Sequence, residues 1–209
     1  MLRSLPKLAS LLALGIIAWG ASFAVPARSQ EPIDVLFLGD NGHHQPLARF
    51  KQLRPVLESR GISLTYTDDV AQLRAETLAN YRAVVLYANI DSIAPEQADA
   101  LLAYVAEGGG FVPLHCASFC FRNDDRIVAL IGAQFLRHGT GVFRTRIELP
   151  EHPVMAGFGG FESWDETYVH HLHAEEGRTV LESRVDDEGA EPWTWVKEHG
   201  RGRVFYTAW

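Results

Sequence analysis

Apolar runs and turn residues alternate regularly along the first half of the chain. Four short runs have the composition of strands buried in a sheet, and they occupy residues 33–38, 62–67, 83–88 and 111–115. Between them, Pro46 and Pro95 each stand where a helix can begin, and apolar residues follow at helical spacing. A shorter helix is predicted at residues 73–81. Strands that alternate with helices in this order predict a mostly parallel sheet with helices on both faces.

The second half is less regular but still rich in strand-like segments. Strands are predicted at residues 141–149, 178–185, 193–197 and 203–208, and a helix at residues 124–131. The sequence contains no internal repeat, low-complexity tract or domain linker. We therefore predict one α/β domain over residues 33–209, built as a three-layer sandwich. It ends on a strand-like segment at Trp209, which leaves open whether the domain is complete there.

The first 29 residues differ from the rest of the chain. Arg3 and Lys7 precede an uncharged apolar run at residues 8–25, and small residues follow near Ala27. This order is typical of a secretory signal peptide over residues 1–29, with an uncleaved N-terminal membrane anchor as the alternative. In both cases the folded part is expected outside the cytoplasm, in the periplasm or the extracellular space.

Charge separates the same two parts. Residues 1–29 carry three basic residues and no acid, which leaves 16 of the 19 basic and all 26 acidic residues for the remainder. The net charge of that remainder is −10 rather than the −7 of the whole chain. An acidic surface disfavours non-specific binding to nucleic acid, which requires basic side chains.

The predicted sheet indicates where a ligand would bind. In an open parallel sheet the ligand crevice lies outside the carboxyl ends of the strands. Polar residues follow three of the predicted strands at that end. They are Asp40, Asn41, His43 and His44 after the first strand, Asn89 after the third, and His115 and Cys116 at the end of the fourth. We expect these segments, distant in sequence, to converge in space.

Cys116 is a candidate nucleophile. A sharp turn from strand to helix at residues 115–118 would lift one side chain above the sheet, and a neighbouring imidazole could activate a thiol there. The glycine that often follows two residues after such a nucleophile is replaced by Ser118. A small buried thiol is the alternative interpretation. Only Cys116 and Cys120 are present, so the chain has no disulfide framework.

Histidines are concentrated between residues 43 and 173, where eight of the nine lie. With Asp165 and Glu166, such imidazoles could bind a divalent metal ion. No pair has the spacing of a compact ligand motif such as His-Glu-x-x-His, so the sequence does not assign the ligands. His170, His171 and His173 are equally compatible with hydrogen-bonded structural roles.

Aromatic residues gather in the second half, close to these acids. Trp164 and Tyr168 flank Asp165 and Glu166, a combination with which proteins stack sugar rings and bind their hydroxyls. Core packing is the alternative role for the aromatic rings. Since neighbouring side chains of a strand point to opposite faces, Asp165 and Glu166 are not interpreted as a paired dyad.

Five segments in a fixed order resemble the ThuA-like, or trehalose-utilisation, family. They occupy residues 39–44, 108–115, 152–157, 161–168 and 200–206. The resemblance implies a flavodoxin-like fold of the class I glutamine amidotransferase type and a role in disaccharide and keto-sugar metabolism. It also implies partners that carry sugar dehydrogenase or cytochrome domains. The amidotransferases use a Cys-His-Glu triad, but this sequence stops before the segment that would supply its His and Glu.

These observations yield three functional hypotheses. In the first, the protein acts on or binds a carbohydrate or keto-sugar, with His115 or His138 as general base and Glu166 as partner acid. In the second, it is a non-catalytic sugar-binding or interaction module. In the third, it is a hydrolase or amidotransferase that depends on Cys116. The predicted substrate-binding residues are Asp40, Asn41, His43, His44, Asn89, Trp164, Asp165 and Tyr168. No cofactor is required by the sequence, and a divalent metal is compatible with it.

Overall fold

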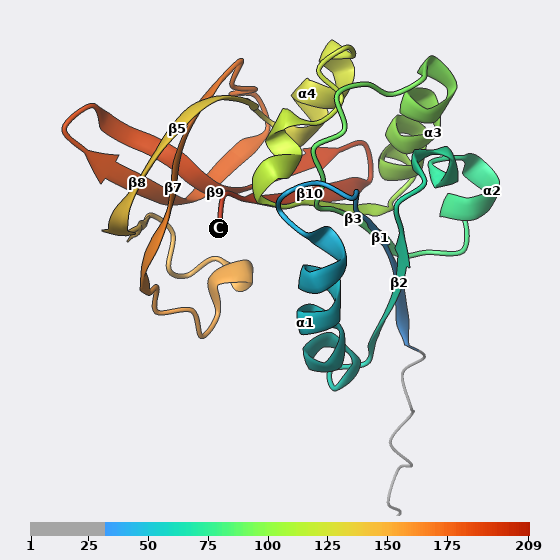
Figure 1. Cartoon of the computed structure of the whole chain (residues 1–209), viewed down its shortest axis with the longest axis horizontal. Coiled ribbons are helices and arrows are strands. Elements are labelled where there is room, and N and C mark those ends of the chain that lie inside the picture. Colours follow the sequence, from blue (N-terminus) through green and yellow to red (C-terminus); the bar gives the residue numbers. More distant parts are fainter. Residues whose placement is uncertain (1–31) are drawn as a thin grey trace, which may run out of the picture. The chain divides into compact units, whose positions relative to one another are not determined.

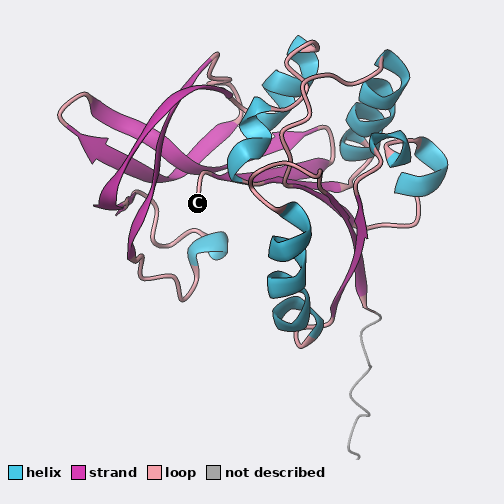
Figure 2. Cartoon of the chain, viewed as in Figure 1, coloured by secondary structure: helices cyan, strands magenta, loops and turns pink. Residues whose placement is uncertain are grey.

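The computed structural model describes residues 32–209, which form one compact unit with an eight-stranded central sheet (Figures 1 and 2). The predicted signal segment, residues 1–29, lies outside the described residues. In spatial order the strands are β2 (Ile62–Thr67), β1 (Ile33–Leu38), β3 (Ala83–Leu86), β4 (Gly110–Pro113), β10 (Gly202–Thr207), β9 (Gly189–His199), β8 (Arg178–Asp186) and β6 (Arg146–Ile147). The first five run parallel, and β9, β8 and β6 continue the sheet in antiparallel order.

Helices cover both faces of the parallel part, as the alternation of strands and helices predicts (Figure 1). On one face lies α1 (Pro46–Glu58), whose Phe50 packs against Val35 and Phe37 of β1. On the other face lie α2 (Ala75–Leu78), α3 (Pro95–Ala106) and α4 (Asp125–Ile131). There Leu36 and Leu38 of β1 join the core that contains Leu101 of α3. Because side chains alternate along a strand, β1 supplies both cores at once. The three-layer α/β fold is thereby confirmed.

A second, two-stranded sheet lies beside the central one. It pairs β5 (Gln134–Arg144) with β7 (Glu162–His171) in antiparallel order, with an irregularity between Phe135 and Arg137. The single strand predicted at residues 141–149 is wrong, because this segment is divided between the end of β5 and the short strand β6. Between them the hydroxyl of Thr145 donates a hydrogen bond to the buried carboxylate of Glu182, which fixes the break in the strand. The sequence pattern also missed β7 altogether.

The fourth predicted strand is two residues too long. β4 ends at Pro113, and residues His115–Phe119 form a 3₁₀ helix. His115 has a left-handed backbone with φ of 48°, a conformation that is uncommon for residues other than glycine. The sharp turn predicted after this strand is therefore present, and His115 is its left-handed residue.

Two further short 3₁₀ helices, Val70–Gln72 and Pro153–Met155, complete the secondary structure of the described residues. No helix within residues 32–209 is both long enough and apolar enough to cross a membrane.

A glycine fixes the contact between α3 and the central sheet. A Cβ atom on Gly202, at the start of β10, would lie 2.0 Å from the carbonyl oxygen of Val105. Only glycine permits this approach at the start of β10, where Arg203 pairs with Gly110 of β4. At the carboxyl ends of the two strands, Thr207 lies beside Leu114. The turn after β4 and the end of β10 therefore lie next to each other.

Candidate functional site

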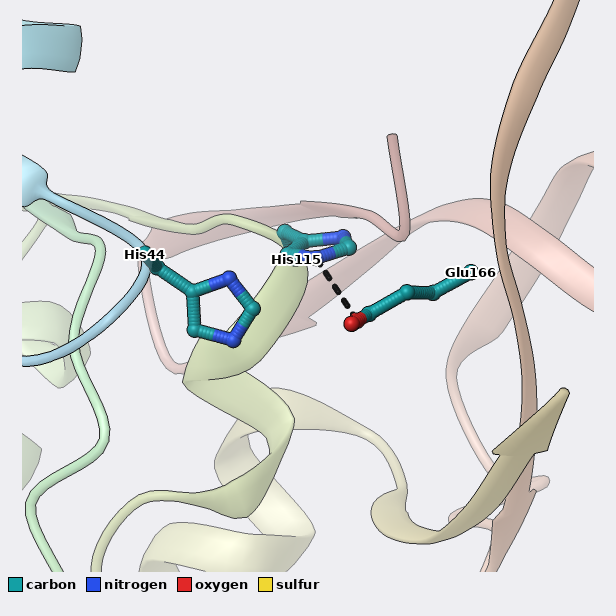
Figure 3. A group of neighbouring side chains, drawn as sticks. All are labelled: His44, His115 and Glu166. Atoms are coloured by element: carbon teal, nitrogen blue, oxygen red, sulfur yellow. Dashed lines mark ion pairs between the residues drawn. The ribbon is translucent and has the colours of Figure 1, made fainter. Parts of the chain in front are cut away.

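Three side chains from distant segments meet outside the carboxyl ends of the parallel strands. His44 comes from the loop between β1 and α1, His115 from the turn after β4, and Glu166 from β7 (Figure 3). One ligand atom of each lies within 4.8 Å of the others. His115 Nε2 lies 3.3 Å from Glu166 Oε2. The convergence expected at this edge of the sheet is therefore present for His44 and His115, and β7 adds the acid.

His115 is held in one orientation by its surroundings. Its Nδ1 lies 2.8 Å from the carbonyl oxygen of Ala208, just after β10. A carbonyl oxygen only accepts hydrogen bonds, so Nδ1 carries the hydrogen. The ring also stacks on Tyr168, with centroids 4.6 Å apart. The imidazole is buried, and its Nε2 is directed at Glu166.

His44 approaches the same point from the other side. Its ring stands edge-on to the ring of His115, with centroids 5.0 Å apart, and the side chain is half-buried. Burial, followed by the neighbouring imidazoles of His115 and His43, lowers the pKa of His44 to about 4. The ring is thus neutral at physiological pH, with an acceptor nitrogen available.

Glu166 has a second imidazole on its other oxygen. His138 of β5 places its Nε2 3.8 Å from Glu166 Oε1, and its Nδ1 lies 3.0 Å from the carbonyl oxygen of Gly139. The pairing of β5 with β7 sets this contact, because His138 is aligned with Tyr168, two residues beyond Glu166. The carboxylate therefore lies between two imidazoles.

Two cavities meet at this cluster. The larger has a volume of about 690 Å³ and the smaller about 220 Å³, and His43, His44 and Glu166 line both. His115 lines the larger cavity, and His138 lines the smaller one. The larger volume lies in the range of about 300–1,000 Å³ that is usual for small-molecule sites.

Four of the predicted residues lie on β7 and line these cavities. Trp164 lines the larger cavity, Glu166 both and Tyr168 the smaller, and these are every second residue of the strand. Trp164 is 67% exposed, so its indole face is available for contact with a ligand. Asp165 also lines the larger cavity, and its carboxylate accepts a hydrogen bond from the backbone N–H of Glu166.

Two other predicted substrate-binding residues lie away from the cluster. Asp40 and Asn41 line a separate surface depression. The carboxylate of Asp40 accepts hydrogen bonds from the backbone N–H groups of Gly42 and Asn89, and so ties the loop that carries His44 to the end of β3. Asn89 itself lines the smaller cavity. Asp40 thus positions the loop, while Asn89 and His43 border the space for a ligand.

Cys116 lies beneath the turn rather than above it. Its side chain is fully buried, and burial raises the pKa of the thiol. An activated nucleophile needs the opposite, a lowered thiol pKa and access to substrate. The residue that the left-handed turn presents to the cavity is His115, one position earlier. This arrangement favours the buried-thiol interpretation of Cys116.

Several cavity residues were not among the predicted site residues. They are Arg49, Gln52, Tyr87, Thr140, Thr207 and Trp209, all lining the larger cavity. Tyr87 had a detectable signal, since it stands two residues before Asn89 at the end of the third predicted strand. Arg49 and Gln52 lie on α1, whose exposed face has no pattern that distinguishes a cavity wall from solvent-exposed surface.

Comparisons with known proteins agree with this architecture. The family model ThuA, described as trehalose utilisation, matches residues 34–209. No functionally curated protein matches the sequence. A ThuA-like protein from Parabacteroides merdae ATCC 43184 has 21% sequence identity and a TM-score of 0.74, over 85% of this chain and 79% of that one.

Two other solved structures share the fold. A ThuA-like protein from Bacteroides uniformis ATCC 8492 has 19% identity and a TM-score of 0.72, over 88% of this chain and 84% of that one. A protein described as part of a GMP synthase, from Thermoplasma acidophilum, has 12% identity and a TM-score of 0.56, over 86% of this chain and 84% of that one. At such identities the similarity concerns the fold, and it agrees with the predicted amidotransferase-like architecture.

Proposed function

Because the chain belongs to the ThuA, or trehalose utilisation, family, we propose that this cluster acts on a keto-sugar by acid–base chemistry. The observation that carries the proposal is the contact of 3.3 Å between His115 Nε2 and Glu166 Oε2 at the border of two cavities. An imidazole and a carboxylate that border a cavity can each accept a proton from a bound substrate, which is the elementary step of general acid–base catalysis.

The proposed reaction is enolisation next to the sugar carbonyl. The base, His115 or His138, removes the proton from the carbon beside the carbonyl, and the C–H electron pair moves to form the enolate. Glu166 contacts both imidazoles and serves as the partner that donates or holds a proton at the carbonyl oxygen. Return of the proton to carbon regenerates the catalyst, so no oxidant or reductant is consumed.

The larger cavity has the chemistry to bind the rest of the sugar. Trp164 and Trp209 supply aromatic faces on which the C–H groups of a sugar ring stack. Asp165, Thr140 and Arg49 line the same cavity and supply acceptors and donors for hydroxyl groups. The substrate would thus lie against Trp164 with its carbonyl at Glu166.

Exchange of deuterium from D₂O into keto-sugars tests this function, because it detects enolisation whatever the final product. We expect the wild-type protein to label the carbon beside the carbonyl, followed by NMR over a panel of ketohexoses and keto-disaccharides. Glu166→Gln and His115→Asn should each lower the exchange rate at least about 100-fold. Asn is chosen at position 115 because it tolerates a left-handed backbone better than Ala.

Glu162→Gln is the matched control, since Glu162 is exposed on the same strand and lines neither cavity. It should exchange at the wild-type rate. Unchanged exchange in both Glu166→Gln and His115→Asn would overturn the proposed chemistry. Saturable sugar binding by calorimetry without any exchange would instead establish the non-catalytic binding module.

A further inference from the structure

The contact between His115 and Glu166 places two acceptor atoms face to face. Nδ1 of His115 carries the hydrogen that it donates to Ala208, so in the neutral ring Nε2 has only a lone pair. A carboxylate oxygen 3.3 Å away also offers only lone pairs. Two lone pairs at this distance repel each other unless a positive centre lies between them. Either a proton or a cation must therefore bridge the two atoms.

His44 decides between these two bridges. A proton links only two atoms, but His44 brings a third potential ligand atom to the same point. One ligand atom each of His44, His115 and Glu166 lies within 4.8 Å of the other two. In Figure 3 the three side chains point toward one common space. Around a tetrahedral Zn²⁺, ligand atoms at about 2.0–2.2 Å from the metal stand roughly 3.3–3.5 Å apart. The His115–Glu166 distance already has this value, and rotation of the half-buried His44 side chain can bring its nitrogen closer.

The orientation of His115 adds an independent argument. Metal-bound histidines almost always donate their other ring N–H to a carbonyl or carboxylate, which fixes the ring and its tautomer. His115 makes this bond to the carbonyl oxygen of Ala208, at 2.8 Å. Its left-handed backbone and the stacked Tyr168 ring restrict the side chain further. The lone pair of Nε2 is thus prealigned toward the space between His44 and Glu166.

We propose that His44, His115 and Glu166 bind one divalent transition-metal ion of the Zn²⁺ or Co²⁺ type, with the remaining coordination position open to the cavities. Two imidazole nitrogens and one carboxylate oxygen form a donor set that such ions bind. The inference deepens the proposed function, because it names the cofactor of that same site.

The open position gives the metal a role with a keto-sugar. A metal ion held by these three residues would take the carbonyl oxygen of the sugar at that position and would polarise it as a Lewis acid. With His115 engaged as a ligand, His138 remains free, lines the smaller cavity and contacts the other oxygen of Glu166. His138 is then the group that moves the proton at carbon.

Metal binding is measured directly, without substrate. Full-length protein stripped with chelator is titrated with Co²⁺, followed by its visible absorption, and with Zn²⁺ by competition calorimetry. We expect one equivalent to bind. His44→Ala and Glu166→Gln should each weaken binding by more than about 100-fold, beyond the 10–100-fold typical of outer-shell changes. His115→Asn should do the same.

Two neighbours serve as matched controls. The ring of His43 is tilted against that of His44, with centroids 4.1 Å apart, but His43 is not part of the ligand group. Glu162 lies on the same strand as Glu166. Glu162→Gln should keep the wild-type affinity, and His43→Ala should weaken binding by no more than the 10–100-fold of outer-shell changes. Absence of stoichiometric binding in the wild type would overturn the metal site, as would wild-type affinity in both His44→Ala and Glu166→Gln.

The two proposals fail in different ways. Undiminished deuterium exchange by the metal-free protein would overturn the role of the metal as cofactor of the reaction and leave the acid–base function standing. One equivalent of tightly bound metal, lost in His44→Ala, without exchange on any keto-sugar would overturn the proposed function and leave the metal site standing. His138→Ala should keep the metal and lose exchange.

Discussion

Two histidine–glutamate pairs each have one member on strand β7, and they differ in what surrounds them. Glu166 faces His115 across 3.3 Å, and four residues further along His170 faces Glu191 of β9 across 2.9 Å. The residue types are the same, and both histidines are buried. Composition alone would therefore assign the two pairs the same role.

The difference lies in the unused hydrogen-bonding capacity. The ring of His170 is closed on both sides, because Nδ1 contacts Glu191 and Nε2 lies 3.0 Å from the hydroxyl of Tyr206. Nε2 of His115 meets only a carboxylate that is 25% exposed and lines two cavities. The His170–Glu191 pair has its hydrogen bonds completed by neighbouring groups and supports the fold. The His115–Glu166 pair leaves electron lone pairs facing a cavity, where they can bind a cation or a substrate.

Tyr206 connects the two pairs. Its hydroxyl contacts His170 Nε2, the carbonyl oxygen of His115 at 2.9 Å and Ser118 Oγ at 3.0 Å. One hydroxyl hydrogen can serve only one of these acceptors at a time. The Tyr206 hydroxyl therefore links the His170–Glu191 pair to the backbone of His115.

The largest expected effect is a difference in stability between variants of the two pairs. Glu191→Gln should lower the free energy of unfolding by about 2 kcal/mol, because the carboxylate accepts hydrogen bonds from both the backbone and the ring of His170. Glu166→Gln should leave it unchanged or raise it, since an amide N–H would face the lone pair of His115. Urea denaturation of both variants checks this. Equal losses would mean that both pairs are structural.

Removal of the Tyr206 hydroxyl should have a smaller effect on stability. Tyr206→Phe takes a hydrogen-bonding partner from His170 and from the carbonyl of His115, at a cost of about 1 kcal/mol. Since it loosens the backbone that orients His115, we also expect a lower turnover with an unchanged KM for keto-sugar exchange. A changed KM with unchanged turnover would contradict this positioning role.

The smallest effect concerns pH. Burial lowers the pKa of His170 below its ordinary 6.5. The carboxylate of Glu191 acts to raise this pKa, and the charges of His173 and Arg178 act to lower it further. Between the folded-state pKa and 6.5 the unfolded chain binds more protons than the folded chain. The free energy of unfolding should therefore fall as the pH decreases below 6.5, and it should not fall further below the folded-state pKa.

His170→Gln is the variant that isolates this contribution. Chemical denaturation between pH 7.5 and pH 5, in chelator, should show a shallower pH dependence for His170→Gln than for the wild type. The lowered pKa of His44 acts in the same direction in both proteins and cancels in the difference. Identical slopes would show that His170 does not titrate differently in the folded and unfolded chain.

Local patterns predicted the parallel half of the fold well. The strands at residues 33–38 and 62–67 coincide with β1 and β2, and the helix predicted to begin at Pro46 is present as α1. These elements have a buried side and a polar side, so their hydrophobic period is visible in the sequence. Strand β7 lacked that signal, because both of its faces carry polar and charged residues.

The candidate site could be predicted only in part. His44, His115, His138 and Glu166 were identified as candidates because polar residues follow strands or combine with aromatic rings. The convergence of His44 with His115 followed from the predicted sheet, and Glu166 was paired with His115 or His138 as a chemical hypothesis. The joining of all three residues at one point was not predicted, since no spacing in the sequence relates residue 44 to residue 166. The shift from Cys116 to His115 at the turn was equally hidden, because it depends on β4 ending at Pro113 rather than at residue 115.

The sequence by itself determined the α/β alternation, the edge of the sheet at which polar residues gather, and the motifs shared with the ThuA family. These features depend on neighbours within a few residues, where hydrophobic period and turn chemistry act. Only the tertiary structure decided that His115 faces Glu166 while His170 is closed by Glu191 and Tyr206. That choice depends on strands β7, β9 and β10 meeting across long connections, and on which ring nitrogen each meeting leaves without a partner.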